Sequence, residues 1–320
     1  KLEIEQSFSL ARFNPDALSK LRLTGECTFS IPEWFFDLTY SSHFRRRIKG
    51  VRLTIPCVVG PHTSVGATLR LTESHLRKDP AMSSRVLVPL RHTNSIAASV
   101  GQSDPGVFEF NFRDERYMPF EGAGVDSVWQ LKLPKVVPQF DYNTISDVIL
   151  RLSYTAEENS DLSSEVEGAT GVLSQLTQSG ITQTLSFRQD LPDVWNRLLA
   201  GVTELNIEIR DVHIPYFMSL FDLQQSPFEI LVTRLTGAAA QYPAVKLDDK
   251  NLTASGLDNA SGLFTLGHTE SALDVIGKHV LKITSLGSAT ITTDSGATRL
   301  DSSQIKDVVL RFGLKRKATS

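Results

Sequence analysis

Apolar and polar residues alternate along most of the chain with a period of two. The alternation is clearest in VRLTI (51–55), FEFNF (108–112), WQLKL (129–133), LNIEI (205–209) and LKITS (281–285). A period of two places successive side chains on opposite faces of a β-strand, one facing the core and one facing water. Clusters of Gly, Pro, Asn, Asp and Ser separate these segments. The pattern therefore predicts a mainly β protein built from antiparallel, β-sandwich-like units.

Two segments show helical spacing instead. Residues 15–23, PDALSKLRL, are predicted to form a short helix with Asn14 as its N-cap and Pro15 at the first helical position. Residues 161–178 follow a Ser- and Glu-rich stretch, and their apolar residues fall on one stripe: Leu162, Val166, Leu173 and Leu176. Because this segment divides the chain almost in half, we predict a short helical linker over residues 159–180.

The two halves of the chain resemble each other. ISDVILRLSY (145–154) recurs as IKDVVLRFGL (305–314), with Ile, Asp, Val, Leu and Arg identical at matching positions. Further matches keep the same order: 129–133 with 279–283, 104–110 with 260–266, 8–21 with 185–198, and 30–36 with 213–219. This order favours an internal duplication over two unrelated β domains with generic strand sequences. We predict a β domain over 1–158, the linker over 159–180, and a second, diverged β domain of similar topology over 181–320.

Composition adds few constraints on function. The chain has 320 residues, a formal net charge of −3, 41% hydrophobic and 22% charged residues, as in a globular protein with room for two cores. A negative net charge gives no attraction toward nucleic acid or an anionic membrane. No apolar run reaches the roughly 18 residues of a spanning helix, so we expect no direct membrane insertion by this segment. Because the chain begins at Lys1 without a leader, we expect a fragment of a longer protein.

Cysteine and histidine spacing gives no sign of a metal or cofactor. Cys27 and Cys57 lie in strand-like sequence. They could form a disulfide only with Cα atoms within about 7 Å, and two buried free thiols are the favoured interpretation. The chain contains no CxxC, HxH or HExxH spacing, and its glycines do not form a GxGxxG or Walker motif. We therefore predict no metal site and no cofactor.

The segment FRDERYMPFEGAG (112–124) carries an unusual mixture of charges. A glycosidase needs two carboxyl groups that converge on one bond, about 5 Å apart or roughly 6.5–9.5 Å apart. Asp114 and Glu115 are adjacent, so a strand would direct them to opposite faces. Each would also have an arginine beside it that favours its ionised form. Because no GxSxG motif is present either, we predict no enzyme activity and assign this segment to docking or assembly.

The candidate docking or assembly residues come from this segment and from the basic run HFRRRIKGVR (43–52). They are Arg113, Asp114, Glu115, Arg116, Tyr117, Phe120, Glu121, Arg45 and Arg46. The basic run is short and lacks aromatic residues at the spacing of base stacking, so we predict no nucleic acid partner. A solvated approach to the next strand, or a patch for an acidic protein partner, fits the run better.

A carbohydrate-binding or cell-surface-binding β-sandwich is the alternative, and its partner would be a glycan. Such modules display aromatic side chains on one sheet face, and the candidates here are Trp34, Phe35, Phe36, Trp129 and Trp195. Period two places most of these at core positions, which favours buried aromatic residues over a binding face.

Four long segments together resemble one known family. They are TGECTFSIPEWFFDLTY (24–40), HFRRRIKGVRLTIPCVVGPHTSVGATLRL (43–71), FRDERYMPFEGAGVDSVWQLKLP (112–134) and FDYNTISDVILRLSYTA (140–156). They resemble the C-terminal TcB-binding domain of the TcA subunits of bacterial toxin complexes, the Tc toxins. Familiar insecticidal TcA chains end shortly after the stretch that matches LRLSYTA, whereas about half of this chain lies beyond it.

The resemblance implies a non-enzymatic role in a secreted bacterial toxin. TcA subunits assemble into a pentameric, syringe-like, pore-forming channel, and their C-terminal domains form the platform on which the TcB–TcC cocoon docks through the β-propeller of TcB. The expected partners are therefore TcB and, as a homopentamer, other TcA protomers. The second half could enlarge this platform, cover it, or serve another partner.

Overall fold

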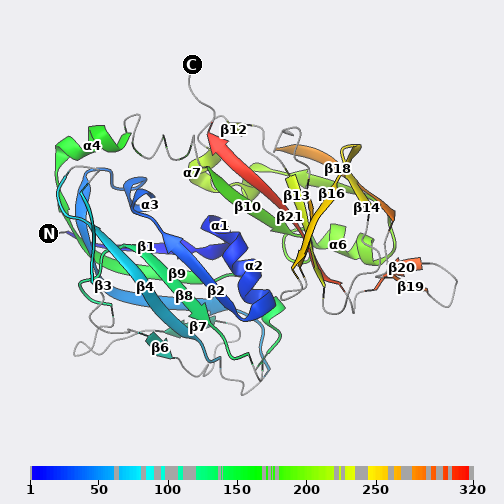
Figure 1. Ribbon diagram of the computed structural model, residues 1–320, viewed down its shortest axis with the longest axis horizontal. Helices are drawn as coiled ribbons and strands as arrows, with labels where there is room; N and C mark the ends of the chain where they lie inside the picture. Colours follow the sequence, from blue (N-terminus) through cyan, green and yellow to red (C-terminus); the bar gives the residue numbers. More distant parts are fainter. Residues whose placement is uncertain are drawn as a thin grey trace. The chain divides into compact units, whose positions relative to one another are not determined.

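In the computed structural model the chain is mainly β, as the alternation predicts, with short helices between the strands (Figure 1). It divides into two compact units, Lys1–Ser179 and Gly180–Ser320. The structure describes residues 2–60, 65–80, 84–89, 95–97, 107–110, 120–135, 138, 140–167, 171, 174, 176, 180–219, 223–224, 228–234, 244–258, 263–267, 276–285, 290–292, 298–301 and 305–316.

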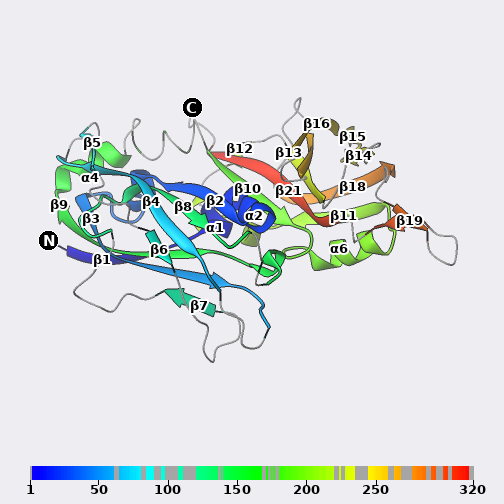
Figure 2. The same ribbon diagram turned by 60° about the horizontal axis from the view of Figure 1, so that its bottom comes forward.

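The first unit contains two antiparallel sheets. One has the strand order β1-β9-β3-β7, with β1 (Leu2–Ser9), β9 (Ile149–Glu158), β3 (His43–Pro56) and β7 (Val107–Phe110). The other has the order β2-β8-β4-β5, with β2 (Glu26–Ile31), β8 (Asp126–Lys132), β4 (Thr68–Arg77) and β5 (Arg85–Leu87), and β6 (Ser95–Ala97) also pairs with β4. The turned view in Figure 2 shows the two sheets as separate layers.

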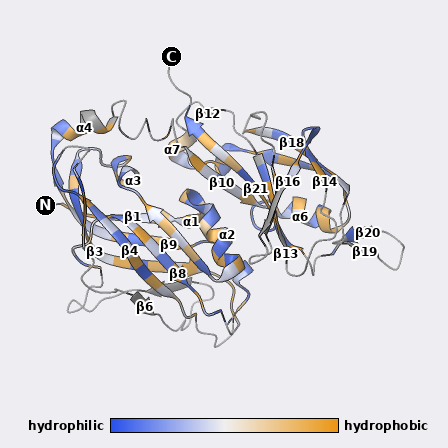
Figure 3. Cartoon of the chain, viewed as in Figure 1, coloured by the Kyte–Doolittle hydropathy of each residue, from blue (hydrophilic) through white to orange (hydrophobic). Residues whose placement is uncertain are grey.

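Alternate residues of the central strands β9 and β8 contribute to the core between the sheets. On β9, Leu150, Leu152 and Tyr154 are fully buried, and on β8 so are Trp129 and Leu131. Figure 3 shows the pattern as hydrophobic and hydrophilic residues that alternate along the strands. Burial of these apolar side chains is the main source of stability for such a sandwich.

Short helices connect the strands of the first unit: α1 (Leu10–Phe13), α2 (Pro15–Thr24), α3 (Glu33–Asp37), the 3-10 helix η1 (Tyr142–Thr144) and α4 (Ser160–Glu167). α2 confirms the helix predicted at 15–23. The Asn14 side chain accepts a hydrogen bond from the Ala17 N–H at 3.2 Å, and Gly25, with φ of 71°, ends the helix. α4 covers the first part of the segment predicted as helical at 161–178, and much of the remainder lies outside the described residues.

The second unit also contains two main antiparallel sheets. The first has the order β10-β21-β13-β17-β16, with β10 (Ile181–Ser186), β21 (Ile305–Arg316), β13 (Phe228–Arg234), β17 (Leu263–Gly267) and β16 (Thr253–Asp258), and β12 (Leu223–Gln224) also pairs with β21. The second has the order β11-β18-β14-β15, with β11 (Glu204–Ile209), β18 (Gly277–Ser285), β14 (Ala244–Leu247) and β15 (Lys250–Asn251). The remaining elements are the hairpin of β19 (Thr290–Thr292) with β20 (Thr298–Leu300), α6 (Pro192–Leu199), η2 (Asp211–His213) and α7 (Tyr216–Ser219).

The strand order of the first unit recurs in the second. β1-β9-β3-β7 corresponds to β10-β21-β13-β17, and β2-β8-β4-β5 corresponds to β11-β18-β14-β15. The register agrees as well. In the first unit Leu150 pairs with Phe8 and Leu53, and in the second Leu310 pairs with Leu185 and Ile230.

An aspartate near the start of the closing strand makes the same hydrogen bonds in each unit: Asp147 precedes β9, and Asp307 lies within β21. Asp147 accepts from the hydroxyl of Ser9 at 2.6 Å, the N–H of Ala11 at 2.9 Å and the N–H of Val148 at 2.7 Å. Asp307 accepts from the hydroxyl of Ser186 at 2.6 Å, the N–H of Arg188 at 3.1 Å and the N–H of Val308 at 2.8 Å. In both units the carboxylate thus ties the first strand to the last.

The two units differ where the sequence match is weakest. In the first unit Ile31 ends β2 and Pro32 follows directly, whereas β11 ends at Ile209 and the Ile214-Pro215 pair comes only after η2. The Ile-Pro segments that match in sequence are therefore displaced by an extra turn in the second unit.

Candidate docking surface

The predicted docking segment lies between β7 and β8, and the structure describes its C-terminal end. Arg113, Asp114, Glu115, Arg116 and Tyr117 lie outside the described residues. Phe120 is 1% exposed and its ring packs edge-on against Trp129, with 5.0 Å between centroids. Its φ of 73° is unusual for a bulky residue, so the buried ring holds this backbone conformation. Phe120 therefore anchors the segment to the core, and the exposed Glu121 is the described residue that faces solvent.

The residues after Glu121 attach the segment to the sheets. The N–H of Gly122 donates to the carbonyl of Ile48 at 2.9 Å, and the N–H of Ile48 donates to the carbonyl of Ala123 at 2.7 Å. A Cβ at Gly124 would lie 1.8 Å from the carbonyl oxygen of His75, so only glycine fits there. These contacts fix the end of the predicted docking segment on β3 and β4.

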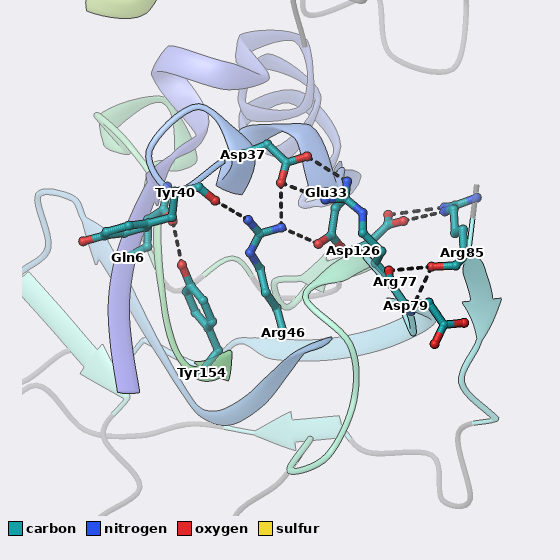
Figure 4. Close-up of polar contacts among 11 residues, drawn as sticks. Gln6, Glu33, Asp37, Tyr40, Arg46, Arg77, Asp79, Arg85, Asp126 and Tyr154 are labelled. Carbon is teal, nitrogen blue, oxygen red and sulfur yellow. Dashed lines mark hydrogen bonds and ion pairs between the residues drawn. The ribbon is translucent and has the colours of Figure 1, made fainter. Parts of the chain in front are cut away.

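Arg46 lies at the centre of a buried ion cluster that contains Glu33, Asp37 and Arg77 (Figure 4). The Arg46 side chain is fully buried, pairs with Asp37 at 2.8 Å and with Glu33, and donates to the carbonyl of Tyr40 at 2.7 Å. Arg77 binds the other side of Asp37 with two hydrogen bonds, at 3.1 and 2.8 Å. The cluster joins α3 to β3 and β4, and its two cations balance its two carboxylates.

The pKa values in the cluster reflect burial and pairing together. Burial raises the pKa of Glu33 above its usual value, although attraction to Arg46 and Arg77 opposes this shift. Burial alone would lower the pKa of Arg77, but its hydrogen bonds to Asp37 and its attraction to both carboxylates raise it. Removing one member of such a group leaves a buried charge without compensation, which is strongly destabilising.

This geometry corrects the assignment of Arg46 as a docking residue. Its strand neighbours Phe44 and Ile48 are buried at i−2 and i+2, and the period of two places Arg46 on the same inward face. This alternation is visible in the sequence and could have predicted that Arg46 points inward. The partners Glu33 and Asp37, four residues apart on α3, gave no signal that they would meet this arginine. Phe120 is likewise a core residue, so neither side chain is available to a partner.

Arg45 lies at the surface, in a β-bulge of β3. Its φ is 48°, and the pairing of β3 with β9 shifts register between Phe44 and Arg47. The side chain is 42% exposed, donates to the carbonyl of Lys78 at 2.5 Å and pairs with Glu157 at 3.0 Å. Arg45 therefore points outward to solvent, whereas Arg46 points inward.

A second ion pair holds the edge strand β5. Arg85 donates to Asp126 at 2.5 and 3.3 Å, and its Nη2 lies 3.1 Å from Nδ1 of His75. The hydrogen bond to Asp126 raises the pKa of Arg85 above its usual value. Because Arg85 lies on β5 and Asp126 on β8, this pair bridges the intervening strand β4.

The two cysteines and most of the aromatic residues singled out in the sequence lie in the interior of the protein. Cys27 and Cys57 are free and buried, and burial raises the pKa of their thiols to about 12 and about 11. Of the aromatic residues that the glycan alternative requires at the surface, Trp129, Phe35 and Phe36 are buried, whereas Trp34 and Trp195 are half-buried. Among the described residues no group of His, Cys, Asp and Glu is arranged to hold a metal ion, and no described helix is long and apolar enough to cross a membrane. The exposed side chains of the described site are therefore mainly charged ones.

The first 156 residues are similar to a known family of toxin-complex domains. Residues 1–156 match the family described as the Tc toxin complex TcA C-terminal TcB-binding domain. The chain is also 33% identical over 156 residues to toxin subunit YenA2 of Yersinia entomophaga, an alignment that covers 44% of this chain. It covers only 11% of the length of that relative.

Proposed function

Because residues 1–156 match the Tc toxin complex TcA C-terminal TcB-binding domain family, we propose that this chain is a non-enzymatic docking domain of a TcA-like toxin subunit. The observation that carries the proposal is the extent of the match. It begins at β1 and runs into β9, the strand that completes the sheet β1-β9-β3-β7. The family thus corresponds to one complete folded unit with its own core.

The proposed partner is the TcB component, carrying TcC in the TcB–TcC cocoon. Docking through an exposed, charged surface suits a domain whose buried ion cluster fixes α3, β3 and β4 in place, because a rigid surface loses little conformational entropy on binding. In the full-length protein we expect a homopentamer of TcA protomers that is secreted and forms the pore. The described part of this chain contributes binding and not the channel.

We further propose that residues 181–320 are a duplicated and diverged copy of the first unit, connected through residues 159–180. The shared strand order, the shared register around Leu150 and Leu310, and the matching contacts of Asp147 and Asp307 support a common origin. The copy would enlarge the docking platform.

Co-elution tests the proposed function. The chain is mixed with the TcB–TcC cocoon encoded alongside it and passed over a size-exclusion column. We expect one earlier peak that contains all three proteins. Separate peaks at concentrations of about 10 μM would contradict the proposal, and binding on a glycan array in the same preparation would favour the carbohydrate-binding alternative instead.

A further inference from the structure

His43, the first residue of β3, is a buried histidine beside the ion cluster. Its exposed fraction is 6%, and its ring stacks on the ring of Tyr40, with 5.0 Å between centroids and 7° between planes. The carbonyl of Tyr40 accepts hydrogen bonds from the N–H of His43 at 3.3 Å and from Nη2 of Arg46 at 2.7 Å. The Arg46–Tyr40 contact is visible in Figure 4. His43 is thus packed into the same corner of the first unit as the buried arginine.

The surroundings of the His43 ring suit a neutral imidazole. Its Nδ1 is buried, and no atom of the described residues forms a hydrogen bond with it. In the imidazolium both ring nitrogens carry a hydrogen and act as donors. Protonation would therefore leave a buried donor without an acceptor, which is unfavourable unless the ring moves toward water.

The charges around the ring act in the same direction overall. Among the described residues, the charged groups that influence His43 are Arg46 of β3 and Glu158 of β9, which pairs with His43 in register. Tyr40 is the titratable group stacked on the ring. Burial and repulsion by Arg46 lower the pKa of His43 below its usual value, and attraction to the exposed Glu158 opposes this shift only in part.

A β-bulge separates His43 from the main part of the β3–β9 ladder. The register shifts between Phe44 and Arg47, and beyond this shift His43 pairs with Glu158 and Phe44 with Glu157. A short run of pairs attached through a bulge can open locally without unfolding the core strands. The bulge therefore provides a hinge for the end of the ladder that contains His43.

The same end of the ladder holds the start of the segment that connects the two units. The N–H of Asn159, the residue after β9, donates to the carbonyl of Ser42 at 2.9 Å, and the N–H of Leu162 in α4 donates to the carbonyl of Asn159 at 3.3 Å. Ser42 directly precedes His43. We call residues 40–44 together with 157–159 the β3 corner.

We propose that His43 is an acid-sensitive latch of the β3 corner. At neutral pH the imidazole closes the corner against Tyr40. In acid the imidazolium leaves it, so that the start of β3 separates from the end of β9 beyond the bulge and releases the connection to the second unit. This conformational role needs no partner, so it stands or falls separately from the docking function.

The pH range of the latch follows from its linkage to folding. The folded pKa of His43 is lower than the unfolded one, so the closed corner has its full stability above the unfolded pKa. That stability is lost as the pH falls through the unfolded pKa toward the folded pKa. Opening is therefore expected on the acid side of neutrality, where histidine is the side chain that ordinarily titrates.

Hydrogen–deuterium exchange of the whole chain, followed by mass spectrometry, tests the proposal. Labelling at about pH 7.5 and at about pH 5, with times scaled to the intrinsic exchange rate, compares the β3 corner with β8 in the core of the same unit. We expect exchange in the corner, relative to β8, to be about threefold or more faster at the lower pH.

His43→Phe keeps a flat ring against Tyr40 and removes the ionisable group. This variant is expected to keep the corner closed at both pH values. His213→Phe is the matched control, because it removes a half-buried histidine of the second unit and should leave the pH dependence of the β3 corner as in the native chain.

Glu158→Gln provides a test that does not depend on the folding of His43→Phe, since Glu158 is exposed. Removing its attraction should lower the pKa of His43 further, so the midpoint of corner opening should move to lower pH. Equal relative exchange at both pH values in the native chain would overturn the latch. So would a His43→Phe variant that retains the native pH dependence, or a Glu158→Gln midpoint that stays in place or moves to higher pH.

Discussion

Replacing Arg46 by methionine tests whether the buried ion cluster holds α3 against the sheet. Methionine retains much of the volume of the side chain and removes its charge. The remaining group of Glu33, Asp37 and Arg77 would then carry a net negative charge inside the protein. Breaking a buried ion pair from one side costs about 3–5 kcal/mol, so the free energy of unfolding of the first unit should fall by about that amount.

The pH dependence of this cost follows from the pKa of Glu33. Its folded pKa is raised by burial, so its ionisation disfavours the folded state, and stability is lost as the pH rises from the unfolded pKa toward the folded one. Without Arg46 the pKa of Glu33 should rise further. The difference in unfolding free energy between the native chain and Arg46→Met should therefore be larger at pH 7 than near pH 4, where Glu33 is protonated in both.

Urea unfolding followed by tryptophan fluorescence measures the effect. The chain has three tryptophans, and Trp195→Phe leaves Trp34 and Trp129, both in the first unit, as reporters of that unit alone. Arg45→Met is the matched control, because its ion pairs are exposed and should contribute no more than about 1 kcal/mol. The double variant Arg46→Met, Glu33→Leu should recover most of the loss, because the remaining Asp37–Arg77 pair is neutral.

Two results would refute the reasoning about Arg46. A cost below about 1 kcal/mol for Arg46→Met would mean that water or other groups already solvate the cluster. A double variant that is no more stable than Arg46→Met would mean that packing around the side chain, and not its charge, is what matters.

Three further predictions concern the charged segment 112–124, the pair Gly122 and Gly124, and the matching aspartates Asp147 and Asp307. Reversing the charges of Arg113 and Arg116 together should weaken binding to the cocoon and leave the melting temperature nearly unchanged, because exposed ion pairs contribute only about 0–1 kcal/mol to stability. An unfolded variant would show instead that these arginines are structural. Gly124→Ala should lower the free energy of unfolding by about 1–3 kcal/mol or more through its clash with the His75 carbonyl. Gly122→Ala should cost only about 1–2 kcal/mol, for its left-handed backbone, and equal urea midpoints for the two variants would contradict this. Asp147→Asn and Asp307→Asn should each cost about 1–3 kcal/mol in urea unfolding of their own unit, whereas an effect in only one unit would show that the shared contacts are not equivalent.

The strands were predictable because their signal is local. The segments 51–55, 205–209 and 281–285 lie within β3, β11 and β18, since a half-buried strand must alternate apolar and polar residues wherever it occurs. The helix at 15–23 was equally accessible, because Asn14 and Pro15 mark its start in the sequence itself. The partners of a strand are not local, so alternation did not predict the strand order of either sheet, and the resemblance between the two halves predicted only that they share a topology.

Arg46 shows where sequence reasoning fails. The three consecutive arginines were interpreted as a run, by composition, although the alternation of Phe44 and Ile48 already placed the middle one inward. Burying it requires two carboxylates from α3 and a second arginine from β4. A cluster assembled from three elements cannot be predicted from the spacing of any one of them.

The comparison of the two units separates residues that build the fold from residues that serve a partner. Asp147 and Asp307 make the same contacts within their own units, so their role in the fold accounts for them. Arg52 pairs in register with Arg151 in the first unit, and Glu229 pairs in register with Arg311 in the second, so the units differ in charge at this position. The most informative positions for docking are therefore those where the two units share the backbone and differ in charge.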